Sequence, residues 1–185
     1  MNQIQFQAPI GTIALTWNSR GAVVRVDWYE TRPGPCRIPE LDPSVPASIA
    51  RFLEKLKSYF TRGEPLGSIP WEFIDSDGWS AFQKKVYRAV ASIPHGETRT
   101  YAWVAMRIGT PAASRAVGQA LRRNPIPVLV PCHRVVSTAA LGGFMGVDDP
   151  GEPEIQLKTR LIQLEECFKS PMFVFAEPSL SMGTA

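Results

Sequence analysis

The chain has 185 residues, of which 44% are apolar and 20% are charged. This length suits one domain or two small ones, and the composition excludes a chain that is disordered throughout. No apolar run is long enough to cross a bilayer, and the first residues lack the basic and apolar regions of a signal peptide. We therefore expect a cytoplasmic protein that does not bind membranes.

Cysteine usage and charge narrow the function classes. The three cysteines, Cys36, Cys132 and Cys167, are widely spaced, which argues against a disulfide framework and against a structural zinc site. The whole chain has 20 basic and 17 acidic residues, but residues 84–134 contain nine Lys or Arg and a single acid, Glu97. This basic block can bind a polyanion, or it can be a set of solvated charges, and charge alone does not distinguish the two.

The first 77 residues predict a small α+β domain. Alternating apolar and polar residues indicate strands, and apolar residues at helical spacing indicate a helix that ends before Gly63. Five prolines between residues 31 and 46 indicate a loop. The predicted strands are 4–6, 11–17 and 22–26, and the predicted helix is 48–60.

A stretch rich in Gly, Pro and Asp over residues 63–78 predicts a domain boundary near Asp77. We expect an N-terminal domain over 1–77, a C-terminal domain over 78–170 and a tail over 171–185. The expected fold class is α+β, with a small antiparallel sheet in the first domain. The second domain is expected to be mainly helical and winged-helix-like.

The second domain has the pattern of a helix-turn-helix. Two short helices inside the basic block are separated by the turn Gly109-Thr110-Pro111. The prolines of residues 124–131 exclude a helix there and predict an extended segment. The predicted helices are 81–93, 101–108, 112–123 and 155–168.

The second helix of the pair has an apolar face that contains Val117 and Leu121. Arg115, Gln119 and Arg122 lie on the opposite face, among small residues. Such a low surface can approach another molecule closely, but the pattern also fits an ordinary amphipathic helix. Taken alone, the pattern favours the ordinary helix.

The run Pro131-Cys132-His133-Arg134 carries the strongest chemical signal. A cysteine attacks as its thiolate, so it needs a base or positive neighbours, and His133 and Arg134 are adjacent. Neighbouring residues of an extended chain point to opposite faces, so a water molecule or a bend after Cys132 is needed to connect its thiol with His133. The alternative is a buried cysteine that acts as a small apolar residue.

Several short motifs in this part of the chain occur together. They are Ile93-Pro94-His95-Gly96-Glu97, Thr100-Tyr101, Ser114-Arg115-Ala116-Val117-Gly118, Arg123-Asn124-Pro125 and Pro131-Cys132-His133-Arg134-Val135-Val136. In this combination the chain resembles the O6-alkylguanine-DNA alkyltransferases, which are methylated-DNA–protein-cysteine methyltransferases. The resemblance covers nearly the whole chain. It implies DNA repair by single-turnover transfer of an alkyl group to the protein, without a cofactor or a metal.

The resemblance implies a role for each matching residue. Cys132 accepts the alkyl group in an in-line displacement, His133 activates Cys132 through a water molecule, and Glu165 orients His133. Asn124 supports this geometry, and Tyr101 donates a hydrogen bond or a proton that eases departure of the guanine. The matching DNA-binding residues are Thr100, Ser114, Arg115, Ala116, Gln119 and Arg122, and the matching pocket residues are Val135, Gly143, Phe144, Met145 and Gly146.

Arg115 matches the arginine finger that fills the gap left when the damaged nucleotide flips out of the duplex. In the family this helix enters the minor groove. The expected partner is double-stranded DNA that contains O6-alkylguanine, with O4-alkylthymine as a further candidate. The expected protein is a monomer, associated with the nucleoid if the source is bacterial or archaeal.

The last predicted helix identifies its inward-facing acid. Its apolar stripe consists of Leu157, Leu161, Leu164 and Phe168. Glu165 lies about 70° from the centre of this stripe, whereas Glu166 lies about 170° away. We therefore expect Glu165 to face the interior and Glu166 to face solvent.

Two features depart from the family pattern. Phe144-Met145 replaces a tyrosine-serine pair of some members, so a backbone N–H must serve at O6, and Met145 narrows or reshapes the pocket. The segment 147–156 is longer than usual and carries four acids. Because these charges repel phosphates, we expect the segment to point away from DNA.

Three other functions fit parts of the sequence. A non-enzymatic damage sensor that resembles the alkyltransferase-like proteins would lack the nucleophile, which this chain retains as Cys132. A cysteine hydrolase has no use for a basic helix-turn-helix. A transcription regulator would need a dimerisation element or an effector domain, and the sequence indicates neither.

Overall fold

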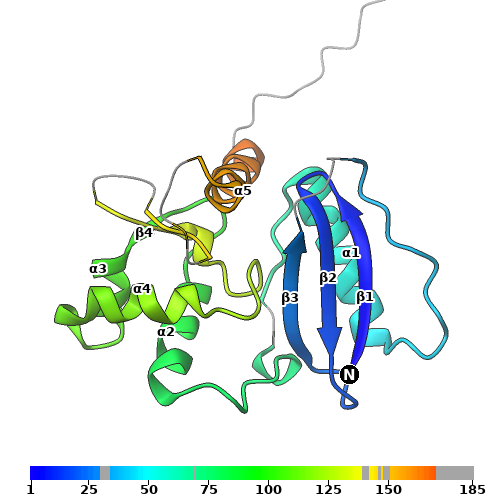
Figure 1. Cartoon of the computed structure of the whole chain (residues 1–185), viewed down its shortest axis with the longest axis horizontal. Helices are drawn as coiled ribbons and strands as arrows, with labels where there is room; N and C mark the ends of the chain where they lie inside the picture. The colour runs from blue at the N-terminus through cyan, green and yellow to red at the C-terminus, as the bar shows by residue number, and fades with distance from the viewer. Residues whose placement is uncertain (30–33, 69, 139–141, 146, 148–150, 170–185) are drawn as a thin grey trace, which may run out of the picture.

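The structure is a computed structural model that describes residues 1–29, 34–68, 70–138, 142–145, 147 and 151–169. It has the predicted α+β fold, with a three-stranded antiparallel sheet in the first part of the chain and helices in the second (Figure 1). No helix in these ranges is long and apolar enough to span a membrane.

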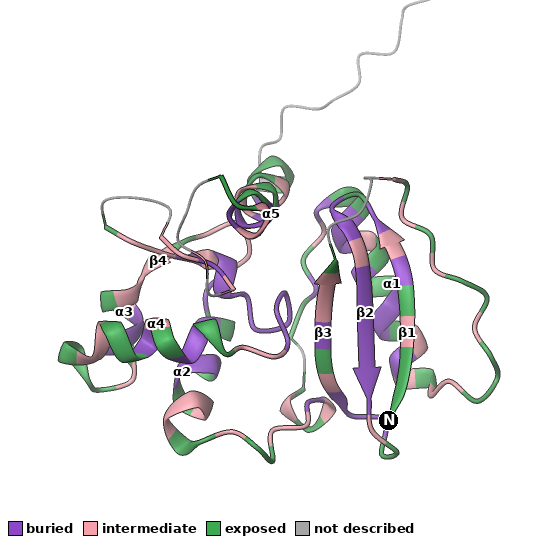
Figure 2. Ribbon diagram, viewed as in Figure 1, coloured by how far each residue is buried: buried purple, intermediate pink, exposed green. Residues whose placement is uncertain are grey.

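The sheet and one long helix form the first part of the molecule. The strands β1 (Asn2–Ala8), β2 (Gly11–Trp17) and β3 (Val23–Tyr29) pair in the order β1-β2-β3, and α1 (Ala47–Arg62) lies across one face of the sheet (Figure 1). The central strand β2 is buried along most of its length (Figure 2). Since adjacent residues of a strand point to opposite faces, both faces of β2 are covered.

The stripe predicted for α1 is the face that packs. Its buried residues are Ile49, Phe52, Leu53, Leu56, Tyr59 and Phe60. The helix ends at Gly63, which has a φ of 69° and donates its N–H to the Tyr59 carbonyl at 2.9 Å. A left-handed residue at this position suits glycine and closes the helix.

The second part of the molecule is mainly helical. Its helices are α2 (Ala81–Ala91), α3 (Tyr101–Arg107), α4 (Ser114–Arg122) and α5 (Pro153–Lys169), and its short parallel strands are β4 (Arg99–Thr100) and β5 (Val135–Val136). Single 3-10 turns are η1 (Trp71–Phe73), η2 (Pro111–Ala113) and η3 (Cys132–Arg134). A capping box starts α2, where Ser80 and Gln83 exchange side-chain and backbone hydrogen bonds. β4 and β5 are too short to show an alternating pattern in the sequence.

The structure corrects three sequence predictions. The segment predicted to be extended, 124–131, instead forms a tight turn in which the Val130 N–H donates to the Ile126 carbonyl at 3.0 Å. Its prolines exclude a helix but not this turn. The helix predicted over 112–123 begins with the separate 3-10 turn η2. Phe168, predicted in the apolar stripe of α5, is 48% exposed.

The two parts of the molecule share one core. A single connected cluster of buried apolar residues extends from β1 to α5. The Val26 N–H donates to the Pro125 carbonyl at 2.9 Å, and the Asp75 N–H donates to the Val23 carbonyl at 2.8 Å. The division into domains near Asp77 stays a prediction.

Candidate active site

Cys132 lies in a bend and not in an extended strand, because it begins the 3-10 turn η3. Its side chain is 95% buried, and Sγ accepts a hydrogen bond from Nδ2 of Asn124 at 3.2 Å. Burial raises the pKa of the Cys132 thiol, although the Asn124 hydrogen bond and the positive charge of Lys158 act in the opposite direction. The resting thiol therefore keeps its proton at neutral pH and needs a base before it can attack.

His133 is placed to be that base. Its ring is fully buried, and Nε2 lies 2.8 Å from Oε1 of Glu165. Burial lowers the pKa of His133, although the neighbouring Glu165 carboxylate raises it, so the ring is neutral at neutral pH. A carboxylate can only accept, so Nε2 carries the hydrogen and Nδ1 is the basic nitrogen. Nδ1 has no hydrogen-bond partner among the described residues.

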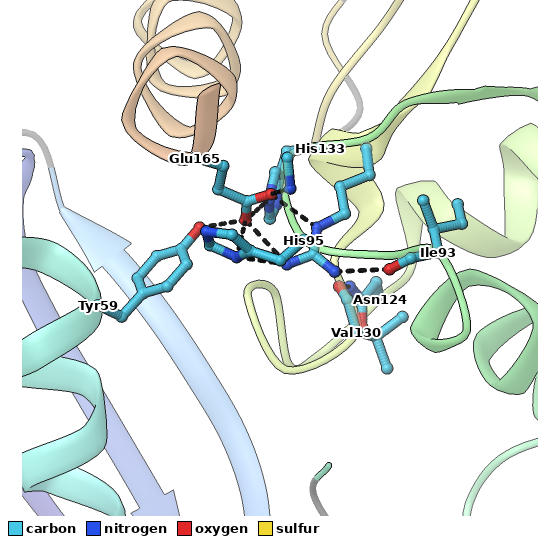
Figure 3. A network of polar contacts seen from close by, with 9 residues as sticks. Tyr59, Ile93, His95, Asn124, Val130, His133 and Glu165 are labelled. Carbon is cyan, nitrogen blue, oxygen red and sulfur yellow. Dashed lines mark hydrogen bonds and ion pairs between the residues drawn. The ribbon is translucent and has the colours of Figure 1, made fainter. Parts of the chain in front are cut away.

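The carboxylate of Glu165 is the centre of a buried polar network (Figure 3). Oε1 accepts from Tyr59 Oη at 2.7 Å, His133 Nε2 at 2.8 Å and Arg134 Nη2 at 3.0 Å. Oε2 accepts from Arg134 Nε at 2.8 Å and from the Gly96 N–H at 2.9 Å. Burial opposes the charge of Glu165, but the hydrogen bonds and charges of His133 and Arg134 outweigh burial and hold its pKa well below the usual range. The acid is therefore ionised and fixed in orientation.

Arg134 ties this network to the loop after α2. Besides Glu165, it donates to the Ile93 carbonyl at 2.8 Å, and its Nη2 lies 3.3 Å from Nδ1 of His95. In the sequence, Arg134 was named only as a positive neighbour of Cys132, and His95 had no assigned role. Their presence in the two motifs that flank the helix-turn-helix was the sequence feature that could have indicated a role.

Tyr59 and Lys158 are two further residues that the sequence analysis missed. Tyr59 had no role assigned from the sequence, although its hydroxyl reaches Glu165. Lys158 is fully buried, and its Nζ donates to the carbonyls of Val135 at 2.7 Å and Gly143 at 3.2 Å. It lies about 90° from the centre of the apolar stripe of α5, so helical periodicity does not mark it as buried.

A cavity of about 470 Å³ connects Cys132 with the surface of α4. The lining includes Tyr101, Ser114, Arg115, Gln119, Arg122, Cys132, Gly143, Phe144 and Met145. Arg115, Gln119 and Arg122 are exposed, as the helical angles predicted, whereas Cys132 is buried. The cavity thus brings Cys132 and Tyr101 together with residues predicted for DNA binding and for the alkyl pocket, whereas Asn124, His133 and Glu165 are not part of its lining.

Two residues of the cavity lining stand out, Tyr101 for a hydrogen bond and Met145 for its backbone conformation. The Tyr101 hydroxyl donates to the Gly143 carbonyl at 3.1 Å, which fixes the ring at the wall of the cavity. Met145 has a φ of 48°, in the left-handed region that non-glycine residues rarely adopt. Phe144, its neighbour, is buried.

Comparisons with known proteins show the family of this chain. A family model described as "6-O-methylguanine DNA methyltransferase, DNA binding domain" matches residues 81–167. A methylated-DNA–protein-cysteine methyltransferase of Bacillus subtilis is 36% identical over 141 residues, which is 76% of each chain. One of Methanosarcina barkeri is 34% identical over 174 residues, covering 86% of this chain and 94% of that one. The chain belongs to the methylated-DNA–protein-cysteine methyltransferase family.

The fold of this methyltransferase is also that of solved relatives. The crystal structure of Mycobacterium tuberculosis OGT in complex with DNA superposes with a TM-score of 0.69 at 29% identity, covering 89% of this chain and 92% of that one. A structure of the O6-methylguanine methyltransferase of the same organism gives a TM-score of 0.70 at 28% identity, covering 92% and 95% of the two chains.

Besides Asn124, His133 and Glu165, four residues predicted for the site of the methyltransferase are not part of the cavity lining or are not described. Val135 is fully buried outside the lining, and its carbonyl accepts from Lys158. Thr100 caps α3 by accepting from the Trp103 N–H at 3.1 Å, and Ala116 is exposed on α4 beside the cavity lining. Gly146 lies outside the described residues, as do residues 148–150 of the acidic segment.

The predicted contrast between the two acids of α5 holds, because Glu165 is buried and Glu166 is exposed. The three cysteines are free thiols, with Cys36 half-buried and Cys167 exposed. Within the part of the chain that the structure describes, no group of three or more His, Cys, Asp or Glu side chains could hold a metal.

Proposed function

We propose that this methyltransferase repairs O6-alkylguanine in double-stranded DNA by moving the alkyl group onto its own Cys132. The observation that carries the proposal is the cavity, because the buried thiol of Cys132 and the exposed side chains of Arg115 and Arg122 line the same space. The relatives' names, which specify methylated DNA and a protein cysteine, support the same reaction.

The residues divide the chemistry among them. Nδ1 of His133 takes the thiol proton of Cys132, relayed by a water molecule, while Glu165 stabilises the imidazolium that forms. The thiolate attacks the alkyl carbon in line, the S–C bond forms and the C–O6 bond breaks. The electron pair of the broken bond stays on the guanine, which receives a proton from the Tyr101 hydroxyl. The thioether has no route back to a thiol, so each molecule reacts once.

The binding mode follows from the shape of α4. Its exposed face has small residues with Arg115, Gln119 and Arg122 projecting, which suits the narrow minor groove better than a bulky helix would. We place the helix-turn-helix of α3 and α4 in that groove, with Arg115 in the gap left by a nucleotide that flips into the cavity. Such a protein acts where the DNA is, in the reducing cytoplasm, without a cofactor and as a monomer.

The first experiment measures the intact mass of the protein after incubation with duplex DNA that contains one O6-methylguanine, followed by peptide mapping. We expect a gain of one methyl group that saturates at one per molecule and maps to Cys132. A Cys132→Ala variant should bind the same duplex but gain no mass. A Cys167→Ala variant is the matched control, because this exposed thiol lies outside the cavity, and it should react like the wild type.

Two results would contradict the transfer reaction. A methyl group at Cys36 or Cys167 would move the reaction away from this cavity. Tight binding specific to the lesion without any mass gain would favour a non-enzymatic damage sensor.

A second experiment tests the DNA-binding mode. Arg122→Ala should weaken binding to damaged and undamaged duplexes alike, and it should reduce the salt dependence of binding by about one counterion. Arg115→Ala should instead abolish the fluorescence rise of a 2-aminopurine placed beside the lesion, which reports nucleotide flipping. Arg51→Ala, an exposed arginine on α1, is the control. Binding that a minor-groove ligand such as netropsin does not compete would contradict the proposed groove.

A further inference from the structure

We infer that Tyr59, in the last turn of α1, is a positioning residue for the transfer reaction: its hydroxyl fixes the Glu165 carboxylate and thereby sets the basicity of His133. The inference rests on the proposed function and extends it to the first part of the chain. Tyr59 touches neither the thiol nor the cavity, so its action goes entirely through Glu165.

The geometry places Tyr59 and His133 on one acceptor atom. Tyr59 Oη donates to Oε1 of Glu165 at 2.7 Å, and His133 Nε2 lies 2.8 Å from the same oxygen. Tyr59 is fully buried and Glu165 is 1% exposed, so water does not compete for these contacts. Burial and the charge of Glu165 raise the pKa of the Tyr59 hydroxyl well above its ordinary value, which keeps it a donor.

The last turn of α1 is held against α5, next to Glu165. Only glycine fits at position 63, because a Cβ there would lie 2.6 Å from the Leu164 carbonyl oxygen. The Tyr59 ring packs edge-on against His95, with centroids 6.0 Å apart. Figure 3 shows Tyr59 reaching from α1 to Glu165 on α5, so the hydroxyl is aimed by two packed helices.

The contact has a defined electrostatic consequence. When the Tyr59 hydroxyl donates to Oε1 of Glu165, it reduces the negative charge that this oxygen offers to His133. The protonated form of His133 is therefore less stable. Without the hydroxyl, Arg134 and Gly96 still orient the carboxylate, but Oε1 becomes more basic and raises the pKa of His133. At a given acidic pH more of the base is then protonated and cannot accept the thiol proton.

The other ionisable groups near His133 and Glu165 leave this argument intact. They are Arg134 on η3, His95 after α2, Lys158 on α5 and the thiol of Cys132. Tyr59→Phe removes none of them and keeps the ring that packs against His95, so a change in the titration of His133 reports the lost hydroxyl.

The test is Tyr59→Phe, which keeps the ring and removes the hydroxyl. Two quantities are measured: the single-turnover rate of methyl transfer against pH, and the ring titration of His133 by NMR in a protein that has only two histidines. We expect the acid limb of the rate profile and the pKa of His133 to rise together by about 0.5–1 pH unit, with a rate loss of several-fold on the acid limb and a much smaller one above it. Phe60→Leu, which loses buried packing next door but no polar contact, should shift neither quantity.

A second variant covers the case in which Tyr59→Phe does not fold. Replacing Tyr59 with 3-fluorotyrosine makes the hydroxyl a stronger donor in the same place, so the pKa of His133 should fall. An unchanged His133 titration in either variant, with only a lower melting temperature, would overturn the inference. The NMR titration does not depend on methyl transfer. A wild-type protein that transfers no methyl group would therefore refute the proposed function without deciding the inference about Tyr59.

Discussion

His133 and Glu165 are buried together, and each has a pKa below its ordinary value. In the unfolded chain these groups titrate near their ordinary values, about 6.5 for histidine and about 4.3 for glutamate. A group with a lowered folded pKa contributes stability that is complete above the unfolded pKa and is lost as pH falls toward the folded pKa. The site therefore makes the fold sensitive to acid.

We predict that the free energy of unfolding starts to decrease below about pH 6.5, where the unfolded chain protonates His133. A further decrease follows below about pH 4.3, where the unfolded chain protonates Glu165. Urea unfolding at a series of pH values measures this. A His133→Gln variant should lose the upper part of the dependence, and a variant that keeps the wild-type slope between about pH 6.5 and 5 would contradict the assignment.

Met145 is one of the two residues, with Phe144, at which the sequence of the pocket is expected to depart from the family pattern. Its side chain lines the cavity, and its φ of 48° is one that glycine adopts without strain. We predict that Met145→Gly widens the pocket and raises the rate for an O6-benzyl lesion several-fold relative to an O6-methyl lesion. The methyl rate of the same variant is the internal control, so an equal change in both rates would show that Met145 does not limit alkyl size.

At the scale of elements, the contact between α1 and α5 depends on Gly63. A Cβ at this position would meet the Leu164 carbonyl at 2.6 Å, and the φ of 69° disfavours any side chain. We predict that Gly63→Ala lowers the free energy of unfolding by about 1–3 kcal/mol and also slows methyl transfer, because Leu164 precedes Glu165. Gly78→Ala is the matched control, since nothing lies within 4 Å of a Cβ there. Equal losses in both variants would contradict the argument.

Part of what the structure shows for these helices could be predicted from the sequence alone. The buried face of α1, the exposed face of α4 and the inward turn of Glu165 follow from helical periodicity, which is a local property. The contact of Tyr59 with Glu165 joins residues 106 positions apart, and no local pattern encodes it.

The turn before Cys132 was missed for a different reason. Its shape depends on Asn124, whose side chain accepts from the Ile126 N–H at 3.2 Å and donates to the Val130 carbonyl at 2.9 Å. Prolines in the sequence indicate where a helix is excluded, but the side-chain hydrogen bonds decide how the chain bends. The sequence also left two ways to connect Cys132 with His133, a water molecule or a bend after Cys132. It did not single out the bend of η3 that brings His133 to Glu165.

At the scale of the whole molecule, the two predicted domains share a core and the polar network around Glu165. The core cluster runs from β1 to α5, and Tyr59 of the first part donates to Glu165 of the second. Because neither part can unfold without exposing apolar surface and breaking this buried hydrogen bond, we predict a single cooperative unfolding transition.

The tryptophans allow this to be tested. Three of the five, Trp17, Trp28 and Trp71, come before the predicted boundary near Asp77, whereas Trp79, which packs against Tyr87 of α2, and Trp103 come after it. In a variant that carries both Trp79→Phe and Trp103→Phe, fluorescence therefore reports on the first part, while far-UV circular dichroism is dominated by helices of the second. We expect the two urea curves to coincide in midpoint and slope. Curves that separate would mean that the boundary near Asp77 divides the chain into independent folding units, and Tyr59 could then leave Glu165 while the helix-turn-helix stays folded.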